Sequence, residues 1–212
     1  MKSIRGYFWY KHLKFFYRLY VLYYKHKIFF PKKSYSCFGE DIFIQKYFKK
    51  LDNNERSIVF VAFTAEEFGL VGSRYFGKQI NPNDIVAGIN IEMIGKESPY
   101  GQKTAWITGF DRSDLGEIIQ KNLSNTNFKV FPDPYIKEKL FFRSDNAALA
   151  KLGIPAHTFS TTPMEKDSDY HKVSDEYKTL DIFTIKETTK LIAKGILSII
   201  QGKDTPTRIE MN

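Results

Sequence analysis

Two adjacent carboxylates, Glu66 and Glu67, are the side chains of this sequence best suited to chemistry. They follow a continuous apolar, β-branched run over residues 57–64, which predicts a strand covered on both faces. Ligands in open α/β sheets bind beyond the carboxyl ends of strands, so the pair is well placed for catalysis. A bare Glu-Glu pair, however, is more often a solvated pair stabilised by the dipole of a helix N-terminus.

Two later segments add candidate groups. Glu92 lies at the end of a second predicted strand, in Asn90-Ile-Glu-Met-Ile-Gly95, and His171 lies in the polar loop Asp169-Tyr-His-Lys-Val-Ser-Asp175. Each is weak evidence alone, because acidic residues commonly end strands and a histidine in a polar loop is usually solvated.

The elements that must position these groups alternate along the chain. Strands are predicted over residues 57–64, 85–93, 104–110, 128–131 and from Pro155 through Ser160. Helices are predicted over residues 67–80, after a cap at Ser113, over residues 144–152, and after a cap at Asp181, where isoleucines at helical spacing form one stripe. This alternation predicts an α/β fold with a mostly parallel sheet and helices on both faces.

Length and composition predict one globular domain plus an additional segment. The chain has 212 residues, of which 42% are apolar, and this suits a single core. The net charge of +8 is uneven, because residues 1–33 hold nine Lys or Arg and no acidic residue, whereas the remaining 23 basic residues face all 24 acidic ones. A basic nucleic-acid-binding face is therefore not expected on the domain. The lone Cys37 allows no disulfide within the chain.

The composition changes between residues 41 and 50, so we divide the chain into an atypical basic aromatic leader, residues 1–45, and a domain, residues 46–212. Charges interrupt the leader too often for a membrane-spanning helix or a signal peptide. The composition of residues 1–40 also suits an AT-rich coding region that is read out of frame or from an internal start. Contact of residues 1–33 with a membrane stays open but is not favoured, and neither the compartment nor the oligomeric state can be read from the sequence.

The string Phe63-Thr-Ala-Glu-Glu-Phe-Gly-Leu-Val-Gly-Ser73 resembles the signature of metallopeptidase family 28, which includes bacterial leucyl aminopeptidases, glutamate carboxypeptidase II and the glutaminyl cyclases. The segments around Glu92 and His171 resemble later family motifs in the same order. Two further segments also resemble family sequence motifs, Arg143-Ser-Asp-Asn146 and Gly153-Ile-Pro155. We interpret them as structural or as shaping the pocket. The resemblance implies the three-layer fold of the zinc aminopeptidases, with its first strands missing.

The resemblance also implies a role for each candidate residue. Glu67 and His171 would bind one zinc ion, Glu92 would belong to a second, and Glu66 would be the general base that takes a proton from the attacking water. The expected activity is removal of the N-terminal residue of a peptide substrate, with no nucleic-acid partner.

The sequence departs from the family pattern upstream of Glu66. Family members carry there a histidine in a His-x-Asp motif and an aspartate that bridges two metals. His12 and His26 lack an aspartate two positions on, and Asp41 lacks the neighbouring Asn and small residues of the bridging turn. The family resemblance implies two zinc ions, but for this chain a single ion or none also stays a possible prediction. The alternative prediction is a catalytically impaired homologue that acts as a binding or structural module.

Overall fold

The computed structural model describes residues 55–210. The predicted leader, residues 1–45, lies outside these residues, as do Cys37 and the histidines and aspartate considered upstream.

A four-stranded sheet forms the centre of the domain, and its strands are short. They are β1 (Gly88–Ile91), β2 (Thr104–Ile107), β3 (Lys129–Pro132) and β4 (Ala156–Ser160), in the order β1-β4-β2-β3. β1 runs parallel to β4, and β2 runs parallel to β3, whereas β2 and β4 are antiparallel. The sheet is therefore mixed, and the prediction of a mostly parallel sheet holds for two of its three pairings.

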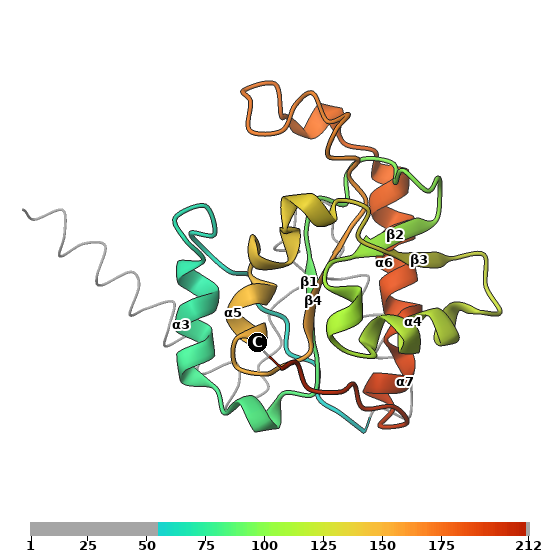
Figure 1. Ribbon diagram of the computed structural model, residues 1–212. Helices are drawn as coiled ribbons and strands as arrows, with labels where there is room; N and C mark the ends of the chain where they lie inside the picture. Colours follow the sequence, from blue (N-terminus) through green and yellow to red (C-terminus); the bar gives the residue numbers. More distant parts are fainter. Residues whose placement is uncertain (1–54, 211–212) are drawn as a thin grey trace, which may run out of the picture. The chain divides into compact units, whose positions relative to one another are not determined.

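Helices and short turns connect the strands (Figure 1). The α-helices are α3 (Val71–Gln79), α4 (Leu115–Leu123), α5 (Asn146–Ala150), α6 (Ile182–Gly195) and α7 (Leu197–Ile200). The 3-10 helices are η1 (Pro82–Asp84), η2 (Phe110–Arg112), η3 (Ile136–Glu138), η4 (Leu140–Phe142) and η5 (Tyr177–Thr179). The predicted cap of α6 is confirmed, because the Asp181 carboxylate accepts the backbone N–H of Phe183 at 2.9 Å.

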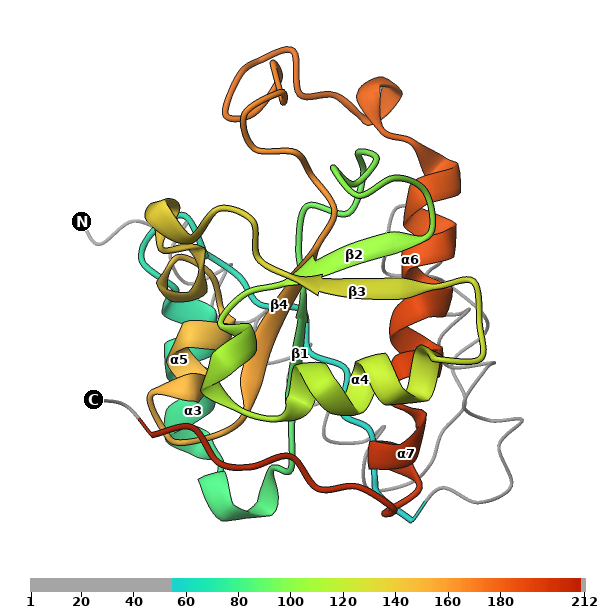
Figure 2. The ribbon, with the colours of Figure 1, turned by 45° about the vertical axis from the view of Figure 1, so that its right-hand side comes forward.

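The sheet lies between two layers of helices, as predicted (Figure 2). On one face, α4 and α6 pack together against β2, β3 and β4, and the main apolar core forms there. Its most deeply buried side chains are Ile107, Leu115, Ile119, Phe159 and Leu191. On the other face, α5 packs against β1 and β4, and α3 packs against α5. This arrangement matches the α/β fold class. Between residues 55 and 210, none of the helices is both long enough and apolar enough to cross a membrane.

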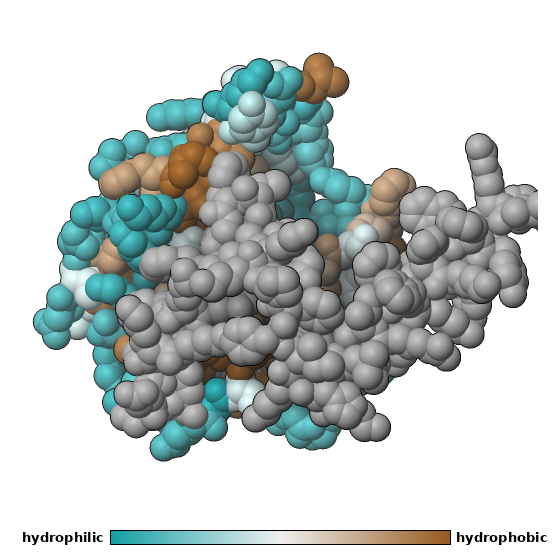
Figure 3. All heavy atoms as spheres, turned by 180° about the vertical axis from the view of Figure 1, so that it is seen from behind, coloured by the Kyte–Doolittle hydropathy of each residue, from teal (hydrophilic) through white to brown (hydrophobic). Residues whose placement is uncertain are grey.

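The predicted strand over residues 57–64 is not formed, and this prediction is wrong for the structure. Val59, Phe60 and Val61 are 51%, 48% and 41% exposed, and because consecutive side chains point to opposite faces, the middle of the segment is left uncovered on both sides by the described residues. Ile58 and Phe63, near its ends, pack against the domain. No strand within residues 55–210 forms a ladder with the segment. Seen from behind, hydrophobic patches lie between hydrophilic areas of the described surface (Figure 3).

Two helix starts also differ from the prediction. The helix expected from Glu67 begins at Val71, after a turn. The N-cap of α4 is Asp114 rather than Ser113. The Ser113 hydroxyl pairs with the ring of His157 at 2.7 Å and also accepts the N–H of Leu115 at 3.4 Å. The first difference follows from the backbone hydrogen bonds of the turn before Val71, and the second is a shift of one residue, which is ordinary for a helix end.

Candidate active site

The two adjacent carboxylates, Glu66 and Glu67, lie in a tight turn and not on a helix. Ala65 and Leu70 both adopt left-handed backbone conformations, with φ of 56° and 60°. Within the turn, the Glu66 carbonyl accepts the N–H groups of Gly69 and Leu70 at 3.0 and 2.9 Å. The turn holds both carboxylates ahead of α3, which begins at Val71. The alternative interpretation, in which the dipole of a helix N-terminus stabilises the pair, therefore does not apply.

The close approach of α3 to the preceding segment requires Gly72. Its N–H donates to the Thr64 carbonyl at 3.0 Å, and a Cβ at this position would lie 2.6 Å from that oxygen. Because the contact is with backbone, it cannot be relieved by a side-chain rotation. The glycine therefore sets the geometry of the turn that carries Glu66 and Glu67.

Glu92 extends from the end of β1, where its N–H donates to the Phe159 carbonyl of β4 at 3.1 Å. The next residue, Met93, has a φ of 52°, and this turns the chain sharply. The Met93 carbonyl accepts the N–H groups of Thr161 and Thr162 at 3.3 and 3.1 Å. The start of the loop after β4 is thus tied to the residue that follows Glu92.

A chain of polar side chains supports Glu92 from α5 and the sheet. The Asn90 amide donates to the Ser144 hydroxyl at 2.7 Å and to the Thr158 hydroxyl at 2.9 Å. Hydrogen bonding from Ser144 opposes the rise in the pKa of the Glu92 carboxyl. Thr158 donates onward to Asn146 at 2.9 Å. These groups satisfy one another in a half-buried region beside Glu92 and so hold the end of β1 rigidly.

His171 lies in the projecting loop between β4 and α6. Its backbone is left-handed, with φ of 56°, and the Tyr170 ring stacks on the imidazole with centroids 4.0 Å apart. The imidazole Nε2 lies 3.2 Å from Oε1 of Glu67, although the two side chains are 57% and 70% exposed. The fold therefore brings together the two residues that the family resemblance assigns to one metal.

Negative charge accumulates around Glu66 and Glu92. Burial is the largest cause that raises the pKa of Glu66, followed by the charges of Glu92, Glu67 and Asp145, and His171 acts in the opposite direction. Burial also raises the pKa of Glu92 most, with contributions from Asp145 and Glu67. Carboxylates close enough to raise one another's pKa form an environment that a cation stabilises.

Asp145 belongs to this group, although the sequence assigned its motif a structural or pocket-shaping role. The residue is only 8% exposed, and its Oδ1 has no hydrogen-bond partner among the described residues. A buried carboxylate oxygen without a donor is costly. The Arg143-Ser-Asp-Asn146 motif was the signal from which Asp145 could have been found.

The described residues fit a zinc ion only in part. The Glu67 carboxylate and the His171 imidazole are suitable donors, but a protein zinc site usually takes three or four protein ligands. Within residues 55–210, no three His, Cys, Asp or Glu side chains are grouped so that they could hold one metal. Glu92 is near enough to influence Glu66 electrostatically, but it does not join Glu67 and His171 in one donor group.

Solved structures share this fold. LapB from Legionella pneumophila is 22% identical, with a TM-score of 0.57 over 76% of this chain and 44% of LapB. BSAP, a zinc aminopeptidase from Bacillus subtilis, is 18% identical, with a TM-score of 0.56 over 71% of this chain and 38% of BSAP. The LapA aminopeptidase of Legionella pneumophila is 22% identical, with a TM-score of 0.53 over 66% of this chain and 38% of LapA. The chain therefore matches less than half the length of these proteins. No curated protein matched its sequence.

The profile of peptidase family M28 matches residues 42–196, which is most of the chain. The match spans the turn with Glu66 and Glu67, the end of β1 with Glu92 and the loop with His171. It confirms the resemblance inferred from the sequence motifs, and the fold of the solved aminopeptidases agrees with it. The chain belongs to peptidase family M28.

Proposed function

We propose that the protein is a zinc-dependent exopeptidase of the aminopeptidase type, which hydrolyses the N-terminal peptide bond of its substrate. The observation that supports this most directly is the 3.2 Å approach of His171 Nε2 to Glu67 Oε1. These residues come from distant segments of a family M28 peptidase chain. Two structural neighbours, the LapA aminopeptidase and the zinc aminopeptidase BSAP, support the same substrate class.

In this proposal, Glu67 and His171 hold one zinc ion, and Glu92 belongs to the site of a second. Glu67 and His171 supply two of the three or four protein ligands that a zinc site usually takes. A bound zinc would supply Lewis acidity, which polarises the scissile carbonyl and lowers the pKa of water. The backbone of Glu92 is held in place for such a role, because its N–H donates to the Phe159 carbonyl of β4 at 3.1 Å.

Glu66 is the proposed general base. Its carboxylate adjoins Glu67 in the turn and makes no ion pair or side-chain hydrogen bond with another described residue, so its oxygens are available to a water molecule. The carboxylate would take a proton from the attacking water and return it to the departing amine. The left-handed conformation of Ala65 directs the chain into this turn and so helps to place Glu66.

A second candidate is a metal-deficient relative that serves as a binding or structural module. The observation that favours it is the absence, within residues 55–210, of three grouped metal-binding side chains. The two candidates differ in zinc content, because the peptidase requires bound metal and the module does not.

The test combines zinc analysis of the full chain with hydrolysis of an aminoacyl reporter. About two zinc ions per chain, as in a two-metal site, and measurable hydrolysis are expected. Glu66→Gln should retain the zinc and lower kcat by about 10²- to 10⁴-fold, because a general base contributes rate and not metal affinity.

Glu117→Gln, an exposed position on α4, is the matched control and should hydrolyse the reporter at the wild-type rate. Equal turnover by wild type and Glu66→Gln would remove Glu66 from its role. Absence of zinc and of turnover in the wild type would favour the binding or structural module.

A further inference from the structure

We infer that Lys96 is a positioning residue for His171, acting by clamping the loop that carries this histidine against the segment that follows Glu92. The inference rests on the proposed function, because it specifies how that site is held together. Lys96 touches neither His171 nor the reacting groups, so its effect must pass through the loop.

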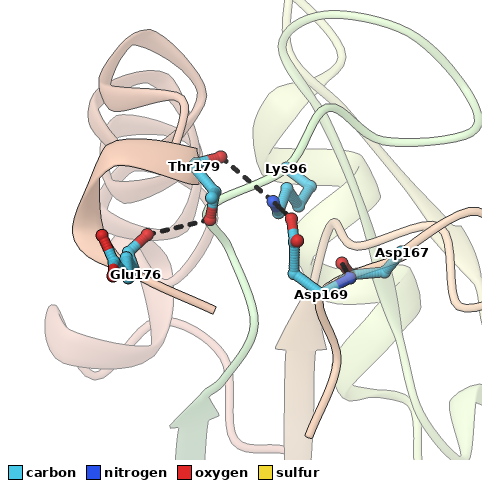
Figure 4. Close-up of polar contacts among 5 residues, drawn as sticks. All are labelled: Lys96, Asp167, Asp169, Glu176 and Thr179. Carbon is cyan, nitrogen blue, oxygen red and sulfur yellow. Dashed lines mark hydrogen bonds and ion pairs between the residues drawn. The ribbon is translucent and has the colours of Figure 1, made fainter. Parts of the chain in front are cut away.

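The clamp is a pair of contacts from one ammonium group. Lys96 Nζ lies 2.9 Å from Oδ2 of Asp169 and donates to the Thr179 carbonyl at 3.1 Å (Figure 4). These two acceptors stand near the start and the end of the segment that contains His171. The side chains of Lys96 and Asp169 are only 22% and 19% exposed, so water screens them less than a surface ion pair.

Asp169 transmits this restraint to His171 over two residues. Its N–H donates to the Asp167 carboxylate at 3.0 Å, and its carbonyl accepts the N–H of Lys172 at 2.9 Å. His171 therefore sits inside a hydrogen-bonded turn. Its left-handed backbone, with φ of 56°, is unfavourable for a residue with a side chain and persists only when surrounding contacts enforce it.

Lys96 itself is held by the sheet. Its carbonyl accepts the Thr161 hydroxyl at 2.6 Å, just after β4. Next to it, the Gly95 carbonyl accepts the N–H of Asp181 at 2.8 Å, and a Cβ on Gly95 would lie 2.5 Å from Leu180. Lys96 thus stands on a backbone that is tied to the sheet and to the start of α6, which gives the loop a rigid support.

The same loop contains an ion pair that serves as a control. Lys178 lies 3.8 Å from Glu176, and the two side chains are 70% and 58% exposed. Such an exposed, long contact contributes little. Removing Lys178 therefore subtracts one positive charge from the loop without removing the clamp.

Hydrogen exchange of the full chain tests the clamp without any metal. Lys96→Met is expected to speed exchange of the amides in residues 163–180 by about tenfold, as local opening becomes easier. Amides of α6 should keep their protection in this variant, which checks that the fold is intact. Lys178→Met should leave the loop unchanged. Unchanged exchange in Lys96→Met, or equal acceleration in both variants, would overturn the inference.

Zinc affinity tests whether the clamp acts through His171. Lys96→Met is expected to weaken zinc binding by about tenfold, a typical effect of losing a supporting contact. In a His171→Ala background the same substitution should have no further effect. Equal weakening in both backgrounds would mean a general structural role, and unchanged affinity in Lys96→Met would also refute positioning. If the wild-type chain bound no zinc, the proposed function would fail, and hydrogen exchange alone would decide on the clamp.

Discussion

Glu67 and His171 lie close enough to form either an ion pair or two ligands of one cation. At 3.2 Å, the imidazole Nε2 and the carboxylate Oε1 contact each other directly, and both side chains are mostly exposed, so a pair of this kind adds little to stability by itself. The strained backbone of His171 and the stacked Tyr170 ring are difficult to explain by a surface ion pair. They are consistent with a side chain held for binding.

His157 is a buried residue whose protonation opposes folding. It is fully buried, its Nδ1–H donates to the Thr108 carbonyl at 2.9 Å, and its Nε2 accepts the Ser113 hydroxyl at 2.7 Å. The neutral ring satisfies both contacts. Burial is the main cause that lowers the pKa of His157 below 6.5, and the nearby charge of Arg112 lowers it further.

This gives a prediction for the dependence of stability on pH. Because the folded-state pKa is below the unfolded one, the unfolded chain binds more protons, and the contribution of His157 is present above pH 6.5 and is lost as the pH falls below it towards the folded value. Urea unfolding at pH 7.0 and 5.5 should show a loss of stability in the wild type. His157→Gln should be less stable at pH 7.0 but should lose less between the two pH values. A variant with the same pH slope as the wild type would contradict this assignment.

At the scale of elements, the start of α3 controls the turn that carries the two glutamates. The helix begins at Val71 only because residues 64–70 form backbone hydrogen bonds that compete with helix formation. Its first turn lies directly on Thr64, with no room for a side chain at position 72. Packing of backbone on backbone, rather than helix propensity, thus decides where this element starts.

Two glycines of α3 give a matched pair of substitutions. Gly72→Ala is expected to lower the free energy of unfolding by about 1–3 kcal/mol, because its Cβ would overlap the Thr64 carbonyl. Gly77→Ala would meet only the flexible end of Leu152 at 3.1 Å, so the gain in helix propensity of up to about 1 kcal/mol should leave it neutral or stabilising. Urea denaturation measures both. Equal effects of the two substitutions would show that the contact with Thr64 is not limiting.

At the scale of the whole molecule, the candidate site depends on segments that only the fold brings together. The turn before α3, the end of β1, the start of α5 and the loop before α6 all contribute carboxylates or an imidazole. The chain spans 32% to 44% of the length of the solved neighbours. The exposed apolar residues 59–61 lie directly ahead of the Glu66 turn. Among residues 55–210, no strand pairs with this segment to hold it in place.

A bound metal is expected to stabilise the whole domain, because it joins the turn of Glu67 to the loop of His171. Zinc at about 100 times its Kd should add about 2.7 kcal/mol to the free energy of unfolding, if it binds only the folded chain. The measurement is the unfolding temperature in zinc and after chelation. His171→Ala should remove most of the difference, whereas an unchanged difference would place the metal elsewhere.

The sequence by itself determined most of the local structure and the ancestry of the chain. The cap at Asp181, the apolar stripes of α4 and α6, and the strands β1 to β4 were all predictable, because caps and periodicity depend on neighbours within a few residues. The Glu-Glu motif likewise indicated family M28, which the match over residues 42–196 confirms. The roles of Glu66, Glu67, Glu92 and His171 stay predictions.

Tertiary structure alone decided the antiparallel pairing of β2 with β4, the open segment before Glu66, the burial of Asp145 and the clamp of Lys96 on the loop of His171. An apolar run predicts that a strand would be favourable, but a strand also requires a partner, and the run itself does not encode one. A lysine in a loop is ordinary in sequence and becomes a clamp only when the fold places an aspartate and a carbonyl within reach. These outcomes depend on contacts between segments far apart in the chain, which local patterns do not specify.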